Sequence, residues 1–185
     1  WGTYKFRFDK KDKSKSNKKL KLTFLGSKTD KNSVVTAQSQ GKILLRNADI
    51  ANLPANIVTP KYLSDFSKKL SLSSNLQIET LEKKDIRKLG CGGLLAVSQG
   101  SKNQPSIIVL KHNPYKRKNK PIVIIGKTVT FDSGGISLKP SKNMEWMRYD
   151  KCGGISVLTI MEIIDSMKLD IPVIGILGAA ENMPG

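Results

Sequence analysis

Two aspartates and two lysines stand close to glycine pairs in one stretch of the chain, and their residue types could bind a metal ion. Asp132 and Asp150 lie 18 residues apart, and Lys127 and Lys139 flank the first of them. Two neighbouring carboxylates repel each other and resist joint ionisation, and a divalent cation removes that penalty. Oxygen ligands suit Mg²⁺ and Mn²⁺, and also Zn²⁺ in mixed sites. A lysine beside a metal either loses its proton and binds the ion, or stays charged and stabilises an oxyanion.

The same residues also allow a simpler interpretation, which the spacing alone leaves open. Aspartate before glycine is common in turns, and Asp150 could simply cap a helix. The stretch does not match a phosphate loop, because it lacks the spaced glycines and the closing Gly-Lys-Ser/Thr. The single histidine, His112, lies in a polar segment and is predicted to face solvent. One histidine gives little support to a Ser-His or Cys-His nucleophile.

The elements around the two acids are predicted to bring them to one edge of a sheet. Asp132 follows the apolar run "TVTF", which is typical of a strand, and Asp150 precedes an apolar helix predicted over residues 152–169. In open α/β sheets, ligands bind where the strands end at their carboxyl edge. Glycines would allow a tight turn after the first acid and a close helix start after the second. These are Gly134, Gly135, Gly153 and Gly154.

The rest of the pattern alternates between strands and helices. Short apolar runs predict strands at residues 76–81, 92–101, 105–112, 120–127 and 171–180. A helix is predicted to begin with Thr59 as its N-cap and Pro60 in its first turn, with Tyr62, Leu63, Phe66 and Leu70 on its apolar face. A shorter helix ends at Gly90.

Several of these predictions concern connections and burial. The strands over residues 92–101, 105–112 and 120–127 are expected to be buried on both faces. Residues 112–121 read as a polar hairpin-type loop, and the apolar runs at 20–26 and 41–54 surround another polar loop. On the helix over residues 152–169, polar residues form a stripe made of Ser156, Thr159, Glu162 and Ser166. This alternation predicts an α/β fold with a mixed, largely parallel sheet flanked by helices.

Composition and charge describe an ordinary globular chain with a basic exterior. The 185 residues are 38% apolar and carry a net charge of +17, from 32 basic and 15 acidic residues. From Gly126 onward there are 6 basic and 7 acidic residues, so the excess lies in the first 125 positions. Since 27 of the 32 basic residues are lysine, bidentate arginine contacts to bases would be few. Either a solvated lysine-rich surface or a weak polyanion-binding surface fits these numbers.

Cysteine usage and hydropathy point to the cytoplasm. Cys91 and Cys152 have no zinc-like or disulfide-like spacing and each precede two glycines, which predicts reduced, buried thiols. The sequence holds no signal-peptide pattern and no apolar run of about 18 residues. We therefore expect a cytoplasmic protein that does not span a membrane.

The segment "IGKTVTFDSGGISLKPSKNMEWMRYDKCGG" resembles the metal-binding segment of the cytosolic leucyl aminopeptidases, the M17 peptidase family. Other stretches resemble the same family in the same order, among them "YKFRFDK", "ADIANLPANIVTPKYLSD", "LGCGGLLAVSQGS" and "GILGAAENMPG". The resemblance therefore covers nearly the whole chain.

The resemblance implies a role for each matching residue. Lys127 matches a lysine that binds one metal through its neutral amine, and Asp150 matches a ligand of that same ion. Asp132 matches a carboxylate shared by two ions, Zn²⁺ or Mn²⁺. Lys139 matches the catalytic lysine directed at the scissile carbonyl oxygen, and Met147 matches a methionine that lines the pocket for the substrate's first side chain. A metal-bridging water would attack the carbonyl.

The resemblance also implies which parts of such an enzyme these residues represent. Residues 1–40 match the end of an amino-terminal domain and a connecting segment, and residues 41–185 match the first part of a catalytic α/β domain. The family's N-T-D-A-E-G-R segment, which completes both metal sites, does not occur in this sequence. We therefore expect an incomplete catalytic domain that is inactive by itself.

Two functions are compatible with this sequence. The first is a metal-dependent aminopeptidase that releases apolar, leucine-like residues from peptides with a free amino terminus, assembled as a homo-oligomer, a hexamer by resemblance. The second is a non-catalytic basic protein that binds nucleic acid on the same fold. The first is favoured, because the basic excess lies outside the segment with the acids.

Overall fold

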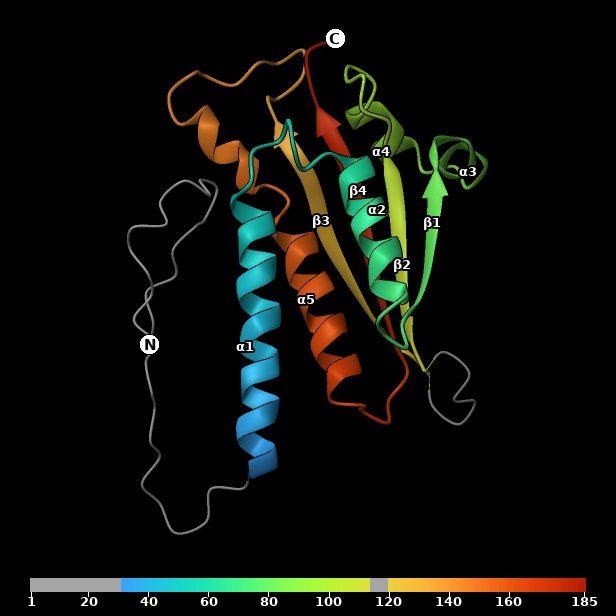
Figure 1. Cartoon of the computed structure of the whole chain (residues 1–185). Coiled ribbons are helices and arrows are strands. Elements are labelled where there is room, and N and C mark those ends of the chain that lie inside the picture. The colour runs from blue at the N-terminus through green and yellow to red at the C-terminus, as the bar shows by residue number, and fades with distance from the viewer. Residues whose placement is uncertain (1–30, 114–119) are drawn as a thin grey trace.

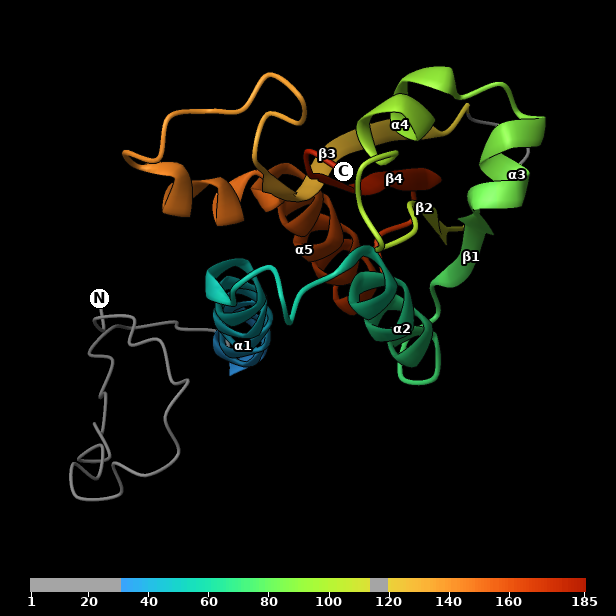
Figure 2. The same ribbon diagram turned by 90° about the horizontal axis from the view of Figure 1, so that it is seen from above.

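A mixed sheet covered mainly on one face by helices forms the protein in a computed structural model, which describes residues 31–113 and 120–185 (Figure 1). The helices are α1 (Lys31–Asn52), α2 (Pro60–Ser71), α3 (Lys83–Lys88), α4 (Gly92–Val97), the 3₁₀-helix η1 (Met144–Tyr149) and α5 (Cys152–Ser166). The strands are β1 (Gln77–Glu82), β2 (Ser106–His112), β3 (Ile122–Asp132) and β4 (Val173–Asn182). Seen from above, α1, α2 and α5 lie on one side of the sheet and α4 on the other (Figure 2).

The sheet is mixed, as predicted, but the described strands are not largely parallel. Their order is β1-β2-β4-β3, and only β3 and β4 run parallel, whereas β1–β2 and β2–β4 are antiparallel. The single helix crossover, β3–α5–β4, returns the chain to the same end of the sheet and produces the parallel pair. The connection between β2 and β3 reverses the chain, as the predicted hairpin required, but β4 lies between these two strands. Part of that connection, residues 114–119, is outside the described residues.

Helix α2 begins as the sequence predicts. Thr59 is its N-cap and accepts a hydrogen bond from the backbone N–H of Tyr62 at 3.2 Å, and Pro60 occupies the first turn. Leu63 and Leu70 are buried in the main core, and Tyr62 and Phe66 pack against it. The predicted strand at 76–81 and the short helix that ends at Gly90 are likewise present as β1 and α3.

The sequence pattern did not predict helix α1. Residues 31–40, predicted to be part of a polar loop, are helical, and α1 continues through the apolar run that follows. The helix crosses the predicted boundary between residues 40 and 41, and that boundary stays a prediction. Asn47 and Ile50 are its buried residues. The predictions for residues 1–21 and 20–26 fall outside the described residues.

The apolar run at 92–101 was wrongly predicted to be a buried strand. Residues 92–97 form helix α4, and no side chain of this described helix is buried. Four apolar residues in a row carry no period that separates a strand from a helical turn. Strand β3 also differs from the prediction of burial on both faces, because Ile122, Val123 and Ile125 are at least half exposed on this edge strand.

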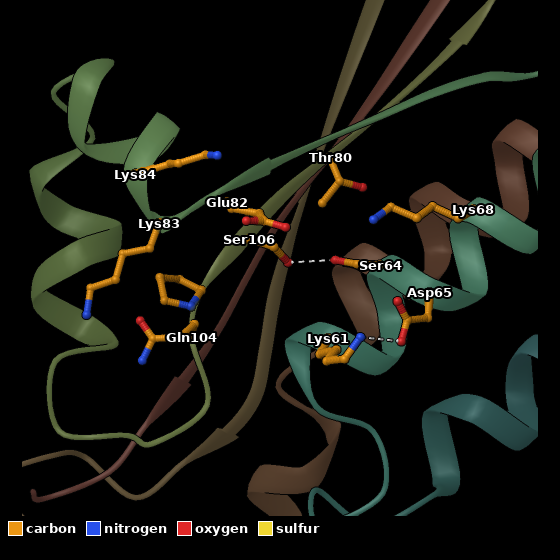
Figure 3. A pocket seen from close by; sticks show the side chains of 11 residues that line it. Lys61, Ser64, Asp65, Lys68, Thr80, Glu82, Lys83, Lys84, Gln104 and Ser106 are labelled. Carbon is orange, nitrogen blue, oxygen red and sulfur yellow. Dashed lines mark hydrogen bonds and ion pairs between the residues drawn. The ribbon is translucent and has the colours of Figure 1, made fainter.

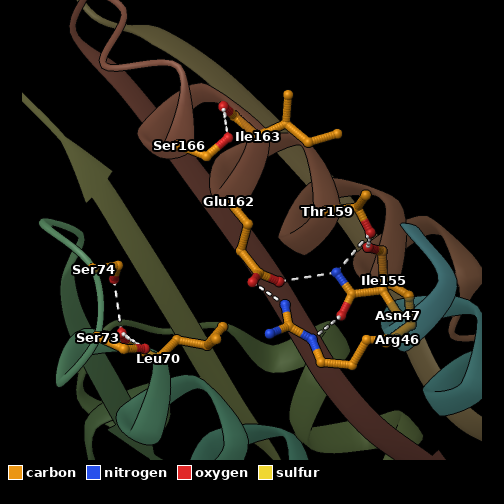
Figure 4. A network of polar contacts seen from close by, with 10 residues as sticks. All are labelled: Arg46, Asn47, Leu70, Ser73, Ser74, Ile155, Thr159, Glu162, Ile163 and Ser166. Carbon is orange, nitrogen blue, oxygen red and sulfur yellow. Dashed lines mark hydrogen bonds and ion pairs between the residues drawn. The ribbon is translucent and has the colours of Figure 1, made fainter. Parts of the chain in front are cut away.

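Helix α5 is confirmed over residues 152–166, but its polar stripe does not face solvent throughout. Thr159 and Glu162 are buried because α1 covers them. The Asn47 amide donates to Thr159 Oγ1 at 3.0 Å and to Glu162 Oε1 at 2.9 Å (Figure 4). Arg46 pairs with Glu162 and lies over the Phe66 ring, 5.4 Å from its centroid. This network fixes α1 on α5.

Close packing of α5 on β3 depends on glycine. A Cβ at Gly154 would lie 2.0 Å from Thr128 Oγ1, and one at Gly126 would lie 2.5 Å from the Gly153 carbonyl oxygen. The first turn of α5 therefore lies directly against the strand that ends in Asp132, as the paired glycines predicted. Among the described residues, no helix combines the length and the apolar character that a bilayer crossing requires.

Candidate metal centre

Four charged residues form two lysine–aspartate pairs, each with one member on β3. Lys127 Nζ lies 2.8 Å from Asp150 Oδ2, and Lys139 Nζ lies 2.5 Å from Asp132 Oδ2. Lys127 and Asp132 come from β3 itself, Lys139 from the loop after it, and Asp150 from the turn before α5. The structure thus pairs all four residues that the sequence singled out for chemistry.

Asp132 is the more tightly held of the two acids. Its Oδ1 accepts hydrogen bonds from the Gly134 backbone N–H at 3.0 Å and from Asn182 Nδ2 at 2.7 Å. Partial burial alone would raise the pKa of this carboxyl. The bonds from Lys139, Gly134 and Asn182 outweigh that effect and bring the pKa of Asp132 below its ordinary value. Asp132 is therefore a carboxylate at neutral pH.

The loop after β3 returns the chain to Asp132. Gly134 and Gly135 have φ values of 91° and 75°, which favour glycine strongly over residues with a side chain. A Cβ at Gly134 would also lie 2.4 Å from the Ser137 carbonyl oxygen. The loop closes where the Lys139 N–H donates to the Ser133 carbonyl oxygen at 2.9 Å. This closure places the Lys139 ammonium beside the carboxylate seven residues earlier.

The Asp150 side chain does not cap helix α5. The N-cap position of α5 is Lys151, and the Asp150 carboxylate instead pairs with Lys127. The Asp150 carbonyl oxygen accepts from the Val129 N–H at 3.2 Å, which ties this turn to β3. The simpler interpretation of Asp150 as a cap is therefore wrong.

Met147 lies beside the catalytic candidate. Its Sδ accepts a hydrogen bond from Lys139 Nζ at 3.2 Å. It comes from η1, where Trp146 and Tyr149 stack at 5.6 Å and the Arg148 guanidinium lies 4.5 Å from the Tyr149 ring centroid. This stacked surface holds the short helix, and with it Met147, near the acids.

Lys151 was not singled out by the sequence, since a lysine beside an aspartate usually indicates a solvated charge. Its side chain is fully buried, and its amine donates to the Leu53 carbonyl oxygen at 3.0 Å and to the Arg148 carbonyl oxygen. Burial lowers the pKa of Lys151 to about 8. The amine joins the segment after α1 to η1. Beside it, burial raises the pKa of the Cys152 thiol. Cys91 and Cys152 are free thiols, as predicted, but only partly buried.

The residues present suit a single metal ion better than two. Lys127, Asp132 and Asp150 offer one amine and two carboxylates, a donor set compatible with Mn²⁺ or Zn²⁺. In residues 31–113 and 120–185, no three His, Cys, Asp or Glu side chains gather closely enough to hold an ion by themselves. Any second ion that shared Asp132 would need most of its ligands from elsewhere.

His112 is not solvent-facing, and that prediction was wrong. It is the last residue of β2 and is 4% exposed. Its Nε2 lies 2.7 Å from the Leu169 carbonyl oxygen, and its Nδ1 lies 3.4 Å from Asp165 Oδ1. The segment that follows α5 covers the ring, which a polar local sequence does not reveal.

A hollow of about 360 Å³ lies between α2, β1 and α3 (Figure 3). Lysines line it, and one of them, Lys61, pairs with Asp65 at 2.8 Å. Ser64 Oγ donates to Ser106 Oγ at 3.0 Å on another part of its wall. The five predicted site residues do not line this hollow.

Fold and site together describe an α/β domain with two lysine–aspartate pairs, and comparison with known proteins identifies its family. The family model for the catalytic domain of the cytosol aminopeptidase family, M17, matches residues 46–185, and the chain belongs to this family. A probable cytosol aminopeptidase of Azoarcus sp. is 40% identical over an alignment that covers 100% of this chain. One from Methylobacillus flagellatus is 47% identical over 149 residues, or 78% of this chain. The chain spans 38% and 30% of these two relatives.

Solved structures agree with the family assignment. The bottromycin maturation enzyme BotP in complex with Mn is 30% identical, with a TM-score of 0.77 over 85% of this chain and 34% of that one. The leucine aminopeptidase of Caenorhabditis elegans has a TM-score of 0.78 over 84% of this chain and 32% of its own, at 24% identity, and supports the fold. The M17 family is metal-dependent, which fits the donor set at the end of β3.

Proposed function

We propose that these residues form part of the catalytic centre of a metal-dependent aminopeptidase. The observation that carries this proposal is the presence of two lysine–aspartate pairs, each with one member on β3, in a chain of the M17 family. The chain supplies one part of the metal site, and the remaining ligands come from outside the described residues.

Lys127, Asp132 and Asp150 would hold the metal. Lys127 would bind one ion through its neutral amine together with Asp150, and Asp132 would bind both ions of a Zn²⁺ or Mn²⁺ pair. Bound metal would polarise the first peptide carbonyl and supply an activated water. Lys127 is 62% exposed, so its amine can turn between the Asp150 carboxylate and an ion without disturbing the core.

Lys139 and Met147 would act on the substrate. The Lys139 ammonium, 35% exposed and fixed by the closed glycine loop, would donate to the oxyanion that forms at the carbonyl. Met147 would contact the first side chain of the substrate, for which a flexible thioether suits an apolar, leucine-like group. The contact of 3.2 Å between Lys139 Nζ and Met147 Sδ supports this assignment.

The substrates would be peptides with a free amino terminus, and the place of action the cytoplasm, in keeping with relatives that are named cytosol aminopeptidases. Assembly into a homo-oligomer, a hexamer in the family, belongs to the same proposal. The nucleic-acid alternative is not favoured, because the family match covers most of the chain and the basic excess lies away from the site.

The test measures how the complete gene product acts on two substrates, a leucine amide with a free amino group and its N-blocked analogue. After removal of metal and reloading with Mn²⁺ or Zn²⁺, it should hydrolyse leucine p-nitroanilide but not the N-acetylated analogue. Asp150→Asn should abolish this turnover, whereas Asp65→Asn, which breaks a comparable lysine–aspartate pair on α2, should leave it intact. Turnover that survives metal removal, or equal loss in both variants, would refute the proposal.

A further inference from the structure

Asn182, the last residue of β4, contacts Asp132 through its side chain. Asn182 Nδ2 donates to Asp132 Oδ1 at 2.7 Å, the shorter of the two hydrogen bonds to that oxygen. The two residues are 50 positions apart in the chain and meet because β3 and β4 are parallel neighbours that end at the same edge. A carboxylate can only accept, so the amide nitrogen must face it.

Backbone and hydroxyl bonds hold the Asn182 main chain independently of this amide. The Ser133 N–H and Ser133 Oγ donate to the Asn182 carbonyl oxygen at 3.0 and 2.8 Å. The strand ends therefore stay joined without the Asn182 side chain. The Asn182 amide adds a hydrogen-bond donor to the Asp132 carboxylate.

The rest of the Asn182 side chain is confined by the glycine loop. A Cβ at Gly135 would lie 2.8 Å from Asn182 Oδ1, so the loop passes close to the amide oxygen. Gly135 has a φ of 75° and leaves the room that this oxygen occupies. The amide is thus fixed at both ends, by the carboxylate on one side and the loop on the other.

These contacts treat the two oxygens of Asp132 differently. Oδ1 receives the Gly134 N–H and the Asn182 amide, both of which are fixed donors. Among the described residues, Oδ2 accepts only from Lys139, whose side chain is 35% exposed. Oδ2 is therefore the oxygen that can exchange its partner more readily, since water reaches the lysine that pairs with it.

We propose that Asn182 is a positioning residue that fixes the Asp132 carboxylate so that Oδ2 is presented to the metal. The inference rests on the proposed function. Without the amide, the carboxylate could rotate about its χ2 torsion, which is broad for aspartate, and present either oxygen. Groups that orient a metal ligand typically change metal affinity or activity by about 10- to 100-fold when removed.

A matched control involves the carboxylate of Glu181, one residue before Asn182 on β4. Asn103 Nδ2 donates to Glu181 Oε2 at 2.8 Å, so Asn103→Ala also removes an amide donor from a carboxylate at the end of β4. Glu181 is buried and also accepts from Ser101, away from the four charged residues of the site. The two alanine variants therefore differ mainly in which carboxylate loses its donor.

The experiment measures Mn²⁺ affinity in the complete gene product from the electron paramagnetic resonance signal of the free ion. Asn182→Ala should weaken Mn²⁺ binding about 10- to 100-fold. Asn103→Ala should leave it within about twofold of wild type, with a similar melting temperature in the two variants. Leucine p-nitroanilide kinetics should show a lower kcat for Asn182→Ala at saturating Mn²⁺, with KM changed less.

Wild-type Mn²⁺ affinity in Asn182→Ala would overturn the inference while leaving the proposed function intact. Equal weakening in both variants would overturn it too, because the effect would then be structural. Failure of the wild-type protein to bind Mn²⁺ or to turn over substrate would instead refute the proposed function, and the inference with it.

Discussion

Two polar clusters lie beside helix α5, and they differ in how far their charged side chains are exposed to solvent. On its α1-facing side, Arg46 and Asn47 converge on the Glu162 carboxylate, which is 8% exposed (Figure 4). Before its amino end, Asp132 and Asp150 each pair with one lysine, and these lysines are 35% and 62% exposed.

This difference in exposure distinguishes a network that stabilises the fold from a site whose acids can change partners. In the α1–α5 network, Asn47 is 1% exposed, and a lost contact would leave buried groups without partners. In the candidate site, each acid is balanced by a lysine that water can reach, and such pairs contribute at most about 1 kcal/mol. The acids can therefore be transferred to a metal or substrate at little cost to the fold.

The largest expected effect comes from the acid that would be shared by both ions. In the complete gene product, Asp132→Asn should abolish metal-dependent turnover and greatly weaken metal binding, because the amide keeps the shape but loses the charge. The unfolding midpoint in urea should change little. Retention of full metal content by this variant would show that Asp132 is not a ligand.

Lys139→Ala should separate catalysis from metal binding. Loss of one oxyanion donor typically lowers kcat by about 10²- to 10³-fold. Metal content, measured by atomic emission after gel filtration, should stay at the wild-type value because Lys139 is not a proposed ligand. A variant without metal would identify Lys139 as a ligand instead.

Lys151 should make stability depend on pH above neutrality. Its pKa is about 8 in the folded protein against 10.5 as the ordinary value. Between these values the unfolded chain holds a proton that the folded chain has released, so stability rises with pH. The difference, about 2.5 pH units, corresponds to an upper bound of roughly 3 kcal/mol.

Comparison of wild type with Lys151→Met separates the pH dependence of stability due to Lys151 from that due to the other lysines. Urea unfolding without metal, at pH 7.5 and pH 10, should show wild type gaining free energy of unfolding relative to the variant. A constant difference between the two proteins across that range would contradict the assignment.

The smallest effect is expected in the structural network. Glu162→Ala leaves the buried Asn47 amide with one acceptor fewer, and should lower the free energy of unfolding by about 1–3 kcal/mol. Glu79→Ala, which breaks the exposed pair with Lys111, should cost less than about 1 kcal/mol. Neither should change Mn²⁺ affinity, and a change in Glu162→Ala would mean that the two clusters are coupled.

Local signals in the sequence predicted most of the elements but not α1, α4 or η1. Thr59 and Pro60 specify the start of α2 through capping chemistry, and the glycines around α5 specify its close approach to β3. Helix α4 was missed because its short apolar run has no diagnostic period. The antiparallel pairs were missed because strand direction depends on how distant segments pack, which local patterns do not encode.

The candidate site was predictable only where its residues are close in sequence. Lys127, Asp132, Lys139 and Asp150 fall in one stretch, and the structure pairs them as two ion pairs. Asn182 could not be identified from local sequence. Its contact is with Asp132, 50 residues earlier, and depends on β4 lying beside β3. The burial of His112 and Lys151 could not be predicted either, because segments distant in sequence cover them.

The central claim is that Lys127, Asp132 and Asp150 bind a metal ion, and the most direct measurement is a calorimetric Mn²⁺ titration of the 185-residue chain. We expect at most one weak Mn²⁺ site per chain, lost in Asp150→Asn and kept in Asp65→Asn, with no hydrolysis of a leucine amide by this chain alone. Three protein donors serve one ion, whereas a two-metal site needs both ions held about 3.5–4 Å apart. Two tight sites per chain, or Mn²⁺ binding unchanged in Asp150→Asn, would contradict it.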